Sequence, residues 1–203
     1  LDVFRKMMRF TSFVTFPLLF GFGLVAPEFI ELALGAKWLP SAELIQILCV
    51  SGAAMPLATL FSNMIISKGR SGTFFWCTFS LGVVQIGLML VLYPLGIQMM
   101  VIAYMLLNTS WLAVWLFFVR RLTGYGYLMF FRDVLPFAIA ATGVMWVAYM
   151  LTRHIESLWA LLGTRVVIAA VLYYVVMKVA RVKILGECER FVRGKFKKNT
   201  KKK

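Results

Sequence analysis

The sequence predicts an all-α fold, a polytopic membrane helix bundle with about six transmembrane helices. Three observations predict this class: six stretches of roughly twenty mostly apolar residues, a hydrophobic content of 62%, and a charged content of only 15%. A bilayer core about 30 Å thick takes about 20 helical residues to cross. A soluble chain of 203 residues would need far more polar surface than these charged residues supply. The composition therefore argues against a soluble globular fold.

The six predicted spans follow one another along the chain with short loops between them. Each is long enough to cross the bilayer core once a few residues of trimming or tilt are allowed. The spans are Phe10–Ala26, Ala42–Ser67, Thr73–Leu92, Gln98–Val119, Val134–Leu151 and Leu158–Ala180. We accordingly expect a cytoplasmic flank at 1–9, the transmembrane bundle at 10–180, and a basic cytoplasmic tail at 181–203 that is disordered at its end.

The basic residues are distributed unequally between the two sides of this predicted bundle. Nineteen of the 22 Lys and Arg residues lie before the first span, in the second and fourth loops, or from Lys178 onward. Lys37 and Arg153 lie in the opposite loops, and Arg165 lies inside the last span. The positive-inside rule then places both ends and the basic loops in the cytoplasm. An even number of spans agrees with both ends lying on one side.

The net charge of +14 follows mostly from this topology and from the tail. It is weak evidence for a nucleic-acid partner, and none is predicted. Each Lys or Arg near a membrane surface contributes about 1 kcal/mol of attraction to anionic lipids. Anionic membrane lipids are therefore the expected partners of the tail, with a specific protein partner as the alternative.

The chain begins at Leu1 with a charged amphipathic run, where a complete protein would carry an initiator Met or a signal peptide. We therefore expect a C-terminal piece of a longer protein. The Lys-rich tract at 197–203 is expected to be the true C-terminus, because such a tract cannot pack.

The second predicted helix is the least lipid-like, because small and polar residues recur along it at steps of three and four. The stripe consists of Gly52, Pro56, Thr59, Asn63 and Ser67. The other faces carry Leu57, Leu60, Phe61, Met64 and Ile65. Small and hydroxylated residues allow close helix contact in membranes. The stripe is expected to face protein, either as a packing seam or as the wall of a cavity that contacts substrate.

Two further helices carry polar or aromatic residues at helical spacing. In the fourth helix an amide and aromatic rings share a face that suits stacking on a sugar, with an interfacial aromatic belt as the alternative. These residues are Tyr104, Asn108, Trp111 and Trp115. Gln85 in the third helix is expected to bond to a neighbouring helix, or else to contact substrate.

Arg165 is the only charged residue well inside an apolar run, roughly 12 Å beyond Ser157. An Arg at a helix centre costs about 2.5–3.5 kcal/mol to insert, so it is a candidate functional residue. The alternative is a structural role, or a long side chain that snorkels to the outer headgroups.

The remaining titratable residues predict little chemistry. His154 is expected to be solvated in an outer loop. The acidic residues, all expected in loops or near helix ends, are Asp2, Glu28, Glu31, Glu43, Asp133, Glu156, Glu187 and Glu189. The cysteines, whose spacings suggest neither a metal site nor a disulfide, are Cys49, Cys77 and Cys188. No catalytic residue, metal or cofactor is predicted, and the protein is not expected to be an enzyme.

Several short motifs, taken in order, resemble the polysaccharide-exporter branch of the multidrug/oligosaccharidyl-lipid/polysaccharide flippase superfamily, which includes the O-antigen flippases. They are Pro17 in an apolar helix, the run 32–38 (LALGAKW) followed by Ala42 and Leu48, the run 67–70 (SKGR), and the run 93–97 (YPLGI) followed by Ala103 and Tyr104. The clear resemblance covers 16–124, and the last two helices match only by count and position.

The resemblance implies a bacterial inner-membrane transporter that moves undecaprenyl-pyrophosphate-linked oligosaccharide between leaflets by alternating access. The six helices would be the last six of fourteen, so the N-terminal helices of the same protein would be absent from this chain. Arg165 is then a possible contact of the pyrophosphate. The substrate-path candidates are Arg165, Asn63, Thr59, Asn108, Tyr104, Trp111 and Gln85.

Three alternatives remain open at this point. A drug/cation antiporter of the same superfamily would be favoured by membrane-embedded carboxylates. A membrane-embedded enzyme of envelope assembly would be favoured by a large periplasmic loop, but the outer loops here are short. A purely structural membrane subunit is the third.

Overall fold

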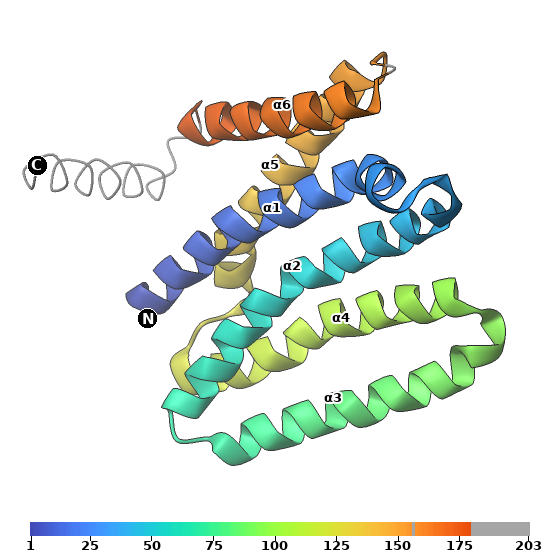
Figure 1. Cartoon of the computed structure of the whole chain (residues 1–203). Helices are drawn as coiled ribbons and strands as arrows, with labels where there is room; N and C mark the ends of the chain where they lie inside the picture. Colours follow the sequence, from blue (N-terminus) through green and yellow to red (C-terminus); the bar gives the residue numbers. More distant parts are fainter. Residues whose placement is uncertain (156, 180–203) are drawn as a thin grey trace, which may run out of the picture.

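The computed structural model describes residues 1–155 and 157–179. Within them the chain forms six long α-helices and two short 3₁₀ helices (Figure 1). The α-helices are α1 (Asp2–Leu34), α2 (Pro40–Ser67), α3 (Ser71–Leu92), α4 (Ile97–Thr123), α5 (Tyr127–Thr152) and α6 (Leu158–Val179). The 3₁₀ helices are η1 (Ala36–Trp38) and η2 (Tyr93–Leu95). All six α-helices are long and apolar enough to cross a membrane, so the predicted fold class is confirmed.

The helix ends follow from local backbone chemistry. Gly124 ends α4 in the left-handed conformation, at φ 77°, and its N–H donates to the Arg120 carbonyl. Glycine adopts this conformation without a Cβ penalty. Gly35, at φ 89°, ends α1, and Pro40 begins α2, where its missing N–H costs nothing.

The first helix is longer than predicted, since α1 runs from Asp2 to Leu34 and the expected span covered only 10–26. The charged run at 1–9 is therefore the start of α1. Arg5 and Arg9 extend the helix because both bind Asp133 at the start of α5. Pro17 and Pro27 both lie inside α1, which neighbouring helices permit in a membrane. The other five helices begin and end within seven residues of their predicted bounds.

The helices lie roughly side by side, with α1 between α6 and α2, and α4 between α2 and α3 (Figure 1). α5 crosses behind α1 and contacts both α1 and α6. α3 lies at the edge against α2 and α4, and Cys77 is the one buried residue among the 22 of this helix.

The largest buried cluster joins α1, α2, α4 and α5. Phe61 and Leu116 are almost completely buried in it, as is Met8. Phe4 packs edge-on against Tyr125, with ring centroids 5.3 Å apart. This cluster lies toward the end of the molecule at which α1 begins.

The start of α1, the α2–α3 loop, the α4–α5 loop and the end of α6 lie on one side of the molecule (Figure 1). The other three connections lie on the opposite side. This alternation agrees with the predicted arrangement of loops, although the cytoplasmic assignment of the first side stays a prediction. The basic tail at 181–203, with Cys188, lies outside the described residues.

Candidate functional site

Arg165 of α6 is buried, with 5% of its surface exposed, and forms an ion pair with Glu28 of α1. Its Nη1 donates to Glu28 Oε1. Glu28 is also buried, with 8% of its surface exposed. The pair therefore connects two helices that are 137 residues apart in the sequence. Two opposite charges this deep compensate each other's loss of water.

Uncharged groups also hold the Arg165 guanidinium. Its Nε donates to Thr152 Oγ1 at 3.0 Å, and its Nη1 lies 3.4 Å from the Leu24 carbonyl oxygen. Its Cζ lies 5.2 Å from the centre of the Tyr149 ring, within the range of a cation–π contact. Thr152 is fully buried. Three helices, α1, α5 and α6, thus fix one cation.

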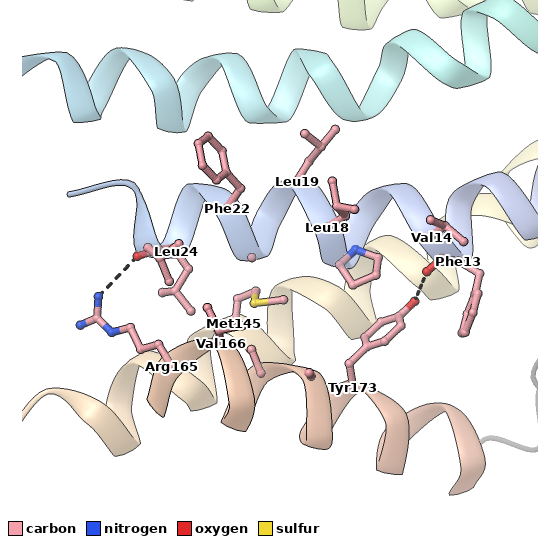
Figure 2. Close-up of a pocket in the computed structure, with 15 residues that line it drawn as sticks. Phe13, Val14, Leu18, Leu19, Phe22, Leu24, Met145, Arg165, Val166 and Tyr173 are labelled. Carbon is pink, nitrogen blue, oxygen red and sulfur yellow. Dashed lines mark hydrogen bonds between the residues drawn. The ribbon is translucent and has the colours of Figure 1, made fainter. Parts of the chain in front are cut away.

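A groove of about 730 Å³ runs between α1 and α6 beside this cation. Figure 2 shows Arg165 toward one end and Tyr173 toward the other. The Tyr173 hydroxyl donates to the Phe13 carbonyl at 2.9 Å. The rest of the lining is almost entirely apolar and includes Val14, Pro17, Leu18, Phe22, Val25, Val166, Ala169 and Ala170. An apolar groove with a cation near its end suits an amphiphile with an anionic head.

One alternative for Arg165 and the prediction for Glu28 are wrong. Arg165 does not snorkel, because its partners lie in the protein and its side chain is buried. Glu28 was expected near a helix end, but it lies six residues before the last residue of α1 and is buried. A signal for this pair was present in the sequence. Glu28 lies about 10 Å along α1 from the turn at Gly35. Arg165 was predicted to lie roughly 12 Å beyond Ser157, in the loop on the same side of the bundle.

The stripe on α2 does not form a packing seam within the described residues. Thr59, Asn63 and Ser67 are exposed. The hydroxyls of Thr59 and Ser67 donate to backbone carbonyls of their own helix, at 3.0 and 2.9 Å. Gly52 packs against α1, because a Cβ there would lie 3.4 Å from the Leu19 side chain. The opposite face, which carries Leu57, Phe61 and Ile65, is the buried one.

The aromatic residues of α4 mostly pack against α3 and α2. Trp115 is buried, with its ring centroid 6.1 Å from that of Phe74, so it is not part of an interfacial belt. The Asn108 amide donates to the Tyr104 carbonyl at 2.9 Å. Tyr104 lines a shallow groove of about 270 Å³ between α2, α3 and α4. The Trp111 indole N–H is buried without a hydrogen-bond partner among the described residues.

The remaining sequence candidates do not meet at one place. Gln85 is half-buried on α3, and its amide makes no hydrogen bond in the part of the chain that the structure describes. His154 is exposed, as predicted, and its Nε2 accepts a hydrogen bond from Arg153 at 3.2 Å. Arg165 therefore lies apart from the candidates on α2, α3 and α4.

A second charged cluster, which the sequence analysis missed, joins the start of α1 to the start of α5. Asp133 is completely buried and accepts hydrogen bonds from Arg5 at 2.9 and 3.0 Å and from Arg9 at 2.7 Å. The Tyr125 hydroxyl donates to the same carboxylate at 3.2 Å. Burial and the nearby carboxylate raise the pKa of Tyr125 above its usual range, so the phenol stays protonated. The signal for this cluster in the sequence was the spacing of four residues between Arg5 and Arg9.

Comparisons with known proteins agree with the resemblance seen in the sequence. A family model described as "Polysaccharide biosynthesis protein" matches residues 2–43, which form α1, η1 and the start of α2. No solved structure matches the chain.

Two relatives are similar to the chain. The first is an uncharacterized membrane protein in the cps region of Klebsiella pneumoniae, 31% identical over 67 residues, or 33% of this chain. The second is the teichuronic acid biosynthesis protein TuaB of Bacillus subtilis, 28% identical over 179 residues, or 82% of this chain. The chain spans only 14% and 35% of the lengths of these relatives. These matches confirm that the chain resembles the polysaccharide flippase-type family of multi-pass membrane proteins.

Proposed function

We infer that this chain forms the C-terminal part of a flippase that moves undecaprenyl-pyrophosphate-linked oligosaccharide across the bacterial inner membrane, for lipopolysaccharide or capsule polysaccharide biosynthesis. Its substrate is an amphiphile with a hydrocarbon tail, an anionic phosphate group and a polar sugar. One observation carries the proposal: the Arg165 cation lies at the end of an apolar groove inside a membrane-spanning bundle. A tail in the groove would bring its phosphate to this guanidinium, which suits phosphate geometrically.

The exposed polar face of α2 supplies a second part of the proposed path. A flippase must give the sugar a hydrated route while the tail stays in lipid. Asn63 is exposed on a helix that is apolar enough to span the membrane, and its amide makes no hydrogen bond to the described residues. An amide that faces hydrocarbon without a partner is costly. We assign this face to the sugar route, completed by N-terminal helices of the same protein that this chain does not contain.

The test is glycan display in a strain whose own gene is deleted and replaced by variants of the complete protein. Ala170→Phe would fill the groove, whereas Val167→Phe places the same ring on an exposed part of α6 that does not line it. We expect the first variant to lose most glycan display and the second to keep it, at equal membrane abundance. Equal display by both variants would contradict the role of the groove.

Arg165 is tested in the same assay. Arg165→Lys keeps the positive charge but loses the paired N–H donors of the guanidinium, so it should retain part of the glycan display. Arg165→Leu should abolish most of it while the protein remains in the membrane. Normal display by Arg165→Leu would remove Arg165 from the substrate path.

A drug/cation antiporter is the second candidate, because Glu28 is a buried carboxylate in a membrane-spanning helix. Arg165 neutralises that carboxylate, so it is not a free cation site. Altered drug susceptibility with normal glycan display in the deletion strain would favour the antiporter.

A further inference from the structure

We propose that Glu28 and a phosphate anion compete for Arg165, and that Glu28 binds a proton when the anion displaces it. When the anion binds Arg165, the Glu28 carboxylate gives up the guanidinium and takes one proton from solvent. When the anion leaves, Glu28 releases that proton and pairs with Arg165 again. This rests on the proposed function only in assuming that Arg165 contacts a phosphate.

The first support is the incomplete pairing of Glu28. Its Oε1 accepts from Arg165, but its Oε2 is buried and has no hydrogen-bond partner among the described residues. Leaving a buried acceptor without a hydrogen bond is energetically unfavourable. The same oxygen is a position where a proton can bind without displacing an existing hydrogen bond.

The second support is that Arg165 keeps its place without Glu28. Thr152, the Leu24 carbonyl and the Tyr149 ring are uncharged, and all three contact the guanidinium. Protonation of Glu28 therefore leaves a fixed cation that has lost its counter-charge. Arginine does not deprotonate in proteins, so a second anion must replace the carboxylate.

The third support is access. Arg165 lines the apolar groove, and its Nη2 donates to none of the residues that the structure describes. A hydrocarbon chain in the groove would place an attached phosphate beside Arg165. Glu28 and the phosphate then compete for one guanidinium.

Other charged and titratable residues lie at the same end of the bundle as Glu28 and Arg165. Glu31 lies one turn farther along α1 and is half-buried, and Lys37 of η1 is exposed. Glu43 of α2 is exposed and accepts a hydrogen bond from Gln98. Tyr149 lies at the end of α5, and the exposed Arg153 and His154 follow this helix. His154 is the one that most needs a control, because imidazole titrates near neutral pH.

The experiment is calorimetric titration of the purified complete protein in a neutral detergent. The probe is dihexyl phosphate, which stays singly charged across the pH range used, and sulfate is the probe without a hydrocarbon chain. Each titration is repeated in two buffers of different ionisation enthalpy, which gives the number of protons taken up per anion. The variants are Glu28→Gln, Arg165→Lys and the matched control His154→Gln.

We expect uptake of about one proton per dihexyl phosphate, and affinity that falls about tenfold per pH unit across the pH range in which that proton is taken up. Glu28→Gln should bind the anion without proton uptake and without this pH dependence, and Arg165→Lys should bind it more weakly. His154→Gln should behave as the wild type. Stronger binding of dihexyl phosphate than of sulfate would identify the natural ligand as a lipid-linked phosphate. Equal binding of the two probes would identify it as a free oxyanion. Either result supports the exchange.

Three results would overturn the exchange: no anion binding, anion binding by the wild type without proton uptake, or uptake that persists in Glu28→Gln. Loss of the uptake in His154→Gln would also overturn it, since the proton would then belong to the imidazole. If a variant fails to fold, the wild-type titrations still overturn the exchange when they show no anion binding or no proton uptake. Because the readout is binding, the exchange can fail while glycan display still supports a flippase, and the reverse also holds.

Discussion

At the scale of single residues, Asp133 is the most heavily bonded carboxylate among the described residues. It is completely buried, and its two oxygens accept hydrogen bonds from Arg5, Arg9 and Tyr125. Two cations on one anion leave one positive charge in excess, and the Arg5 and Arg9 side chains reach water, with 26% and 38% of their surfaces exposed. The anion is therefore buried while the cations stay partly hydrated.

This arrangement predicts a graded effect of removing its parts. Asp133→Asn leaves two cations beside a neutral amide and should lower the free energy of unfolding by about 1–3 kcal/mol, less than for a fully buried pair because the arginines remain solvated. Tyr125→Phe removes one hydrogen bond and should cost about 1 kcal/mol. Thermal unfolding in detergent measures both. A larger loss for Tyr125→Phe than for Asp133→Asn would show that the phenol hydrogen bond, and not the two ion pairs, dominates the stability of this cluster.

The sequence allowed Arg165 of one charged site to be predicted, and no part of the Asp133 site. Arg165 was predicted as buried deep in an apolar run, because hydropathy shows depth along a single helix. Glu28 and Asp133 were assigned to helix ends, because the spans were drawn from apolar content and the charged turns were trimmed away. Which residues on two distant helices meet depends on rotation about each helix axis, and apolarity on nearly all faces of a membrane helix does not fix that rotation.

At the scale of the element, α2 has a buried face that the pattern of small and polar residues did not predict. Those residues were expected to face protein, as a packing seam or a cavity wall, whereas Phe61, Leu57 and Ile65 form the face that is buried within the described residues. Lipid is as apolar as leucine, so hydrophobicity alone does not select the face that packs. Shape does, and the bulky face of α2 fills the space between α1, α4 and α5.

We therefore expect Phe61→Ala to destabilise the protein by about 3–5 kcal/mol, because it leaves a cavity in the core. Phe79→Ala on α3 is the matched control, since 52% of Phe79 is exposed, and it should change stability little. Thermal unfolding in the same detergent tests the pair. Similar losses for the two phenylalanines would mean that the exposed side of α3 is covered by other parts of the protein.

At the scale of the whole molecule, the connections alternate between two sides (Figure 1). The distribution of Lys and Arg predicts which side is cytoplasmic. In a protein with Cys49, Cys77 and Cys188 replaced, Lys37→Cys should react with an impermeant thiol reagent in intact cells. Arg70→Cys should react only after permeabilisation. The reverse pattern would invert the topology and would place Arg165 in the cytoplasmic half of the membrane.

The position of α3 at the edge of the helix array has a consequence for how substitutions are tolerated. With one buried residue, this helix packs little against the described chain, and we expect lipid to cover most of it. Lipid distinguishes apolar from charged side chains but not one apolar shape from another. Most positions of α3 should therefore accept any apolar residue and reject charge, whereas the bulky face of α2 should reject even a change of shape. The bilayer constrains the chemistry of α3, and its neighbouring helices constrain the geometry of α2.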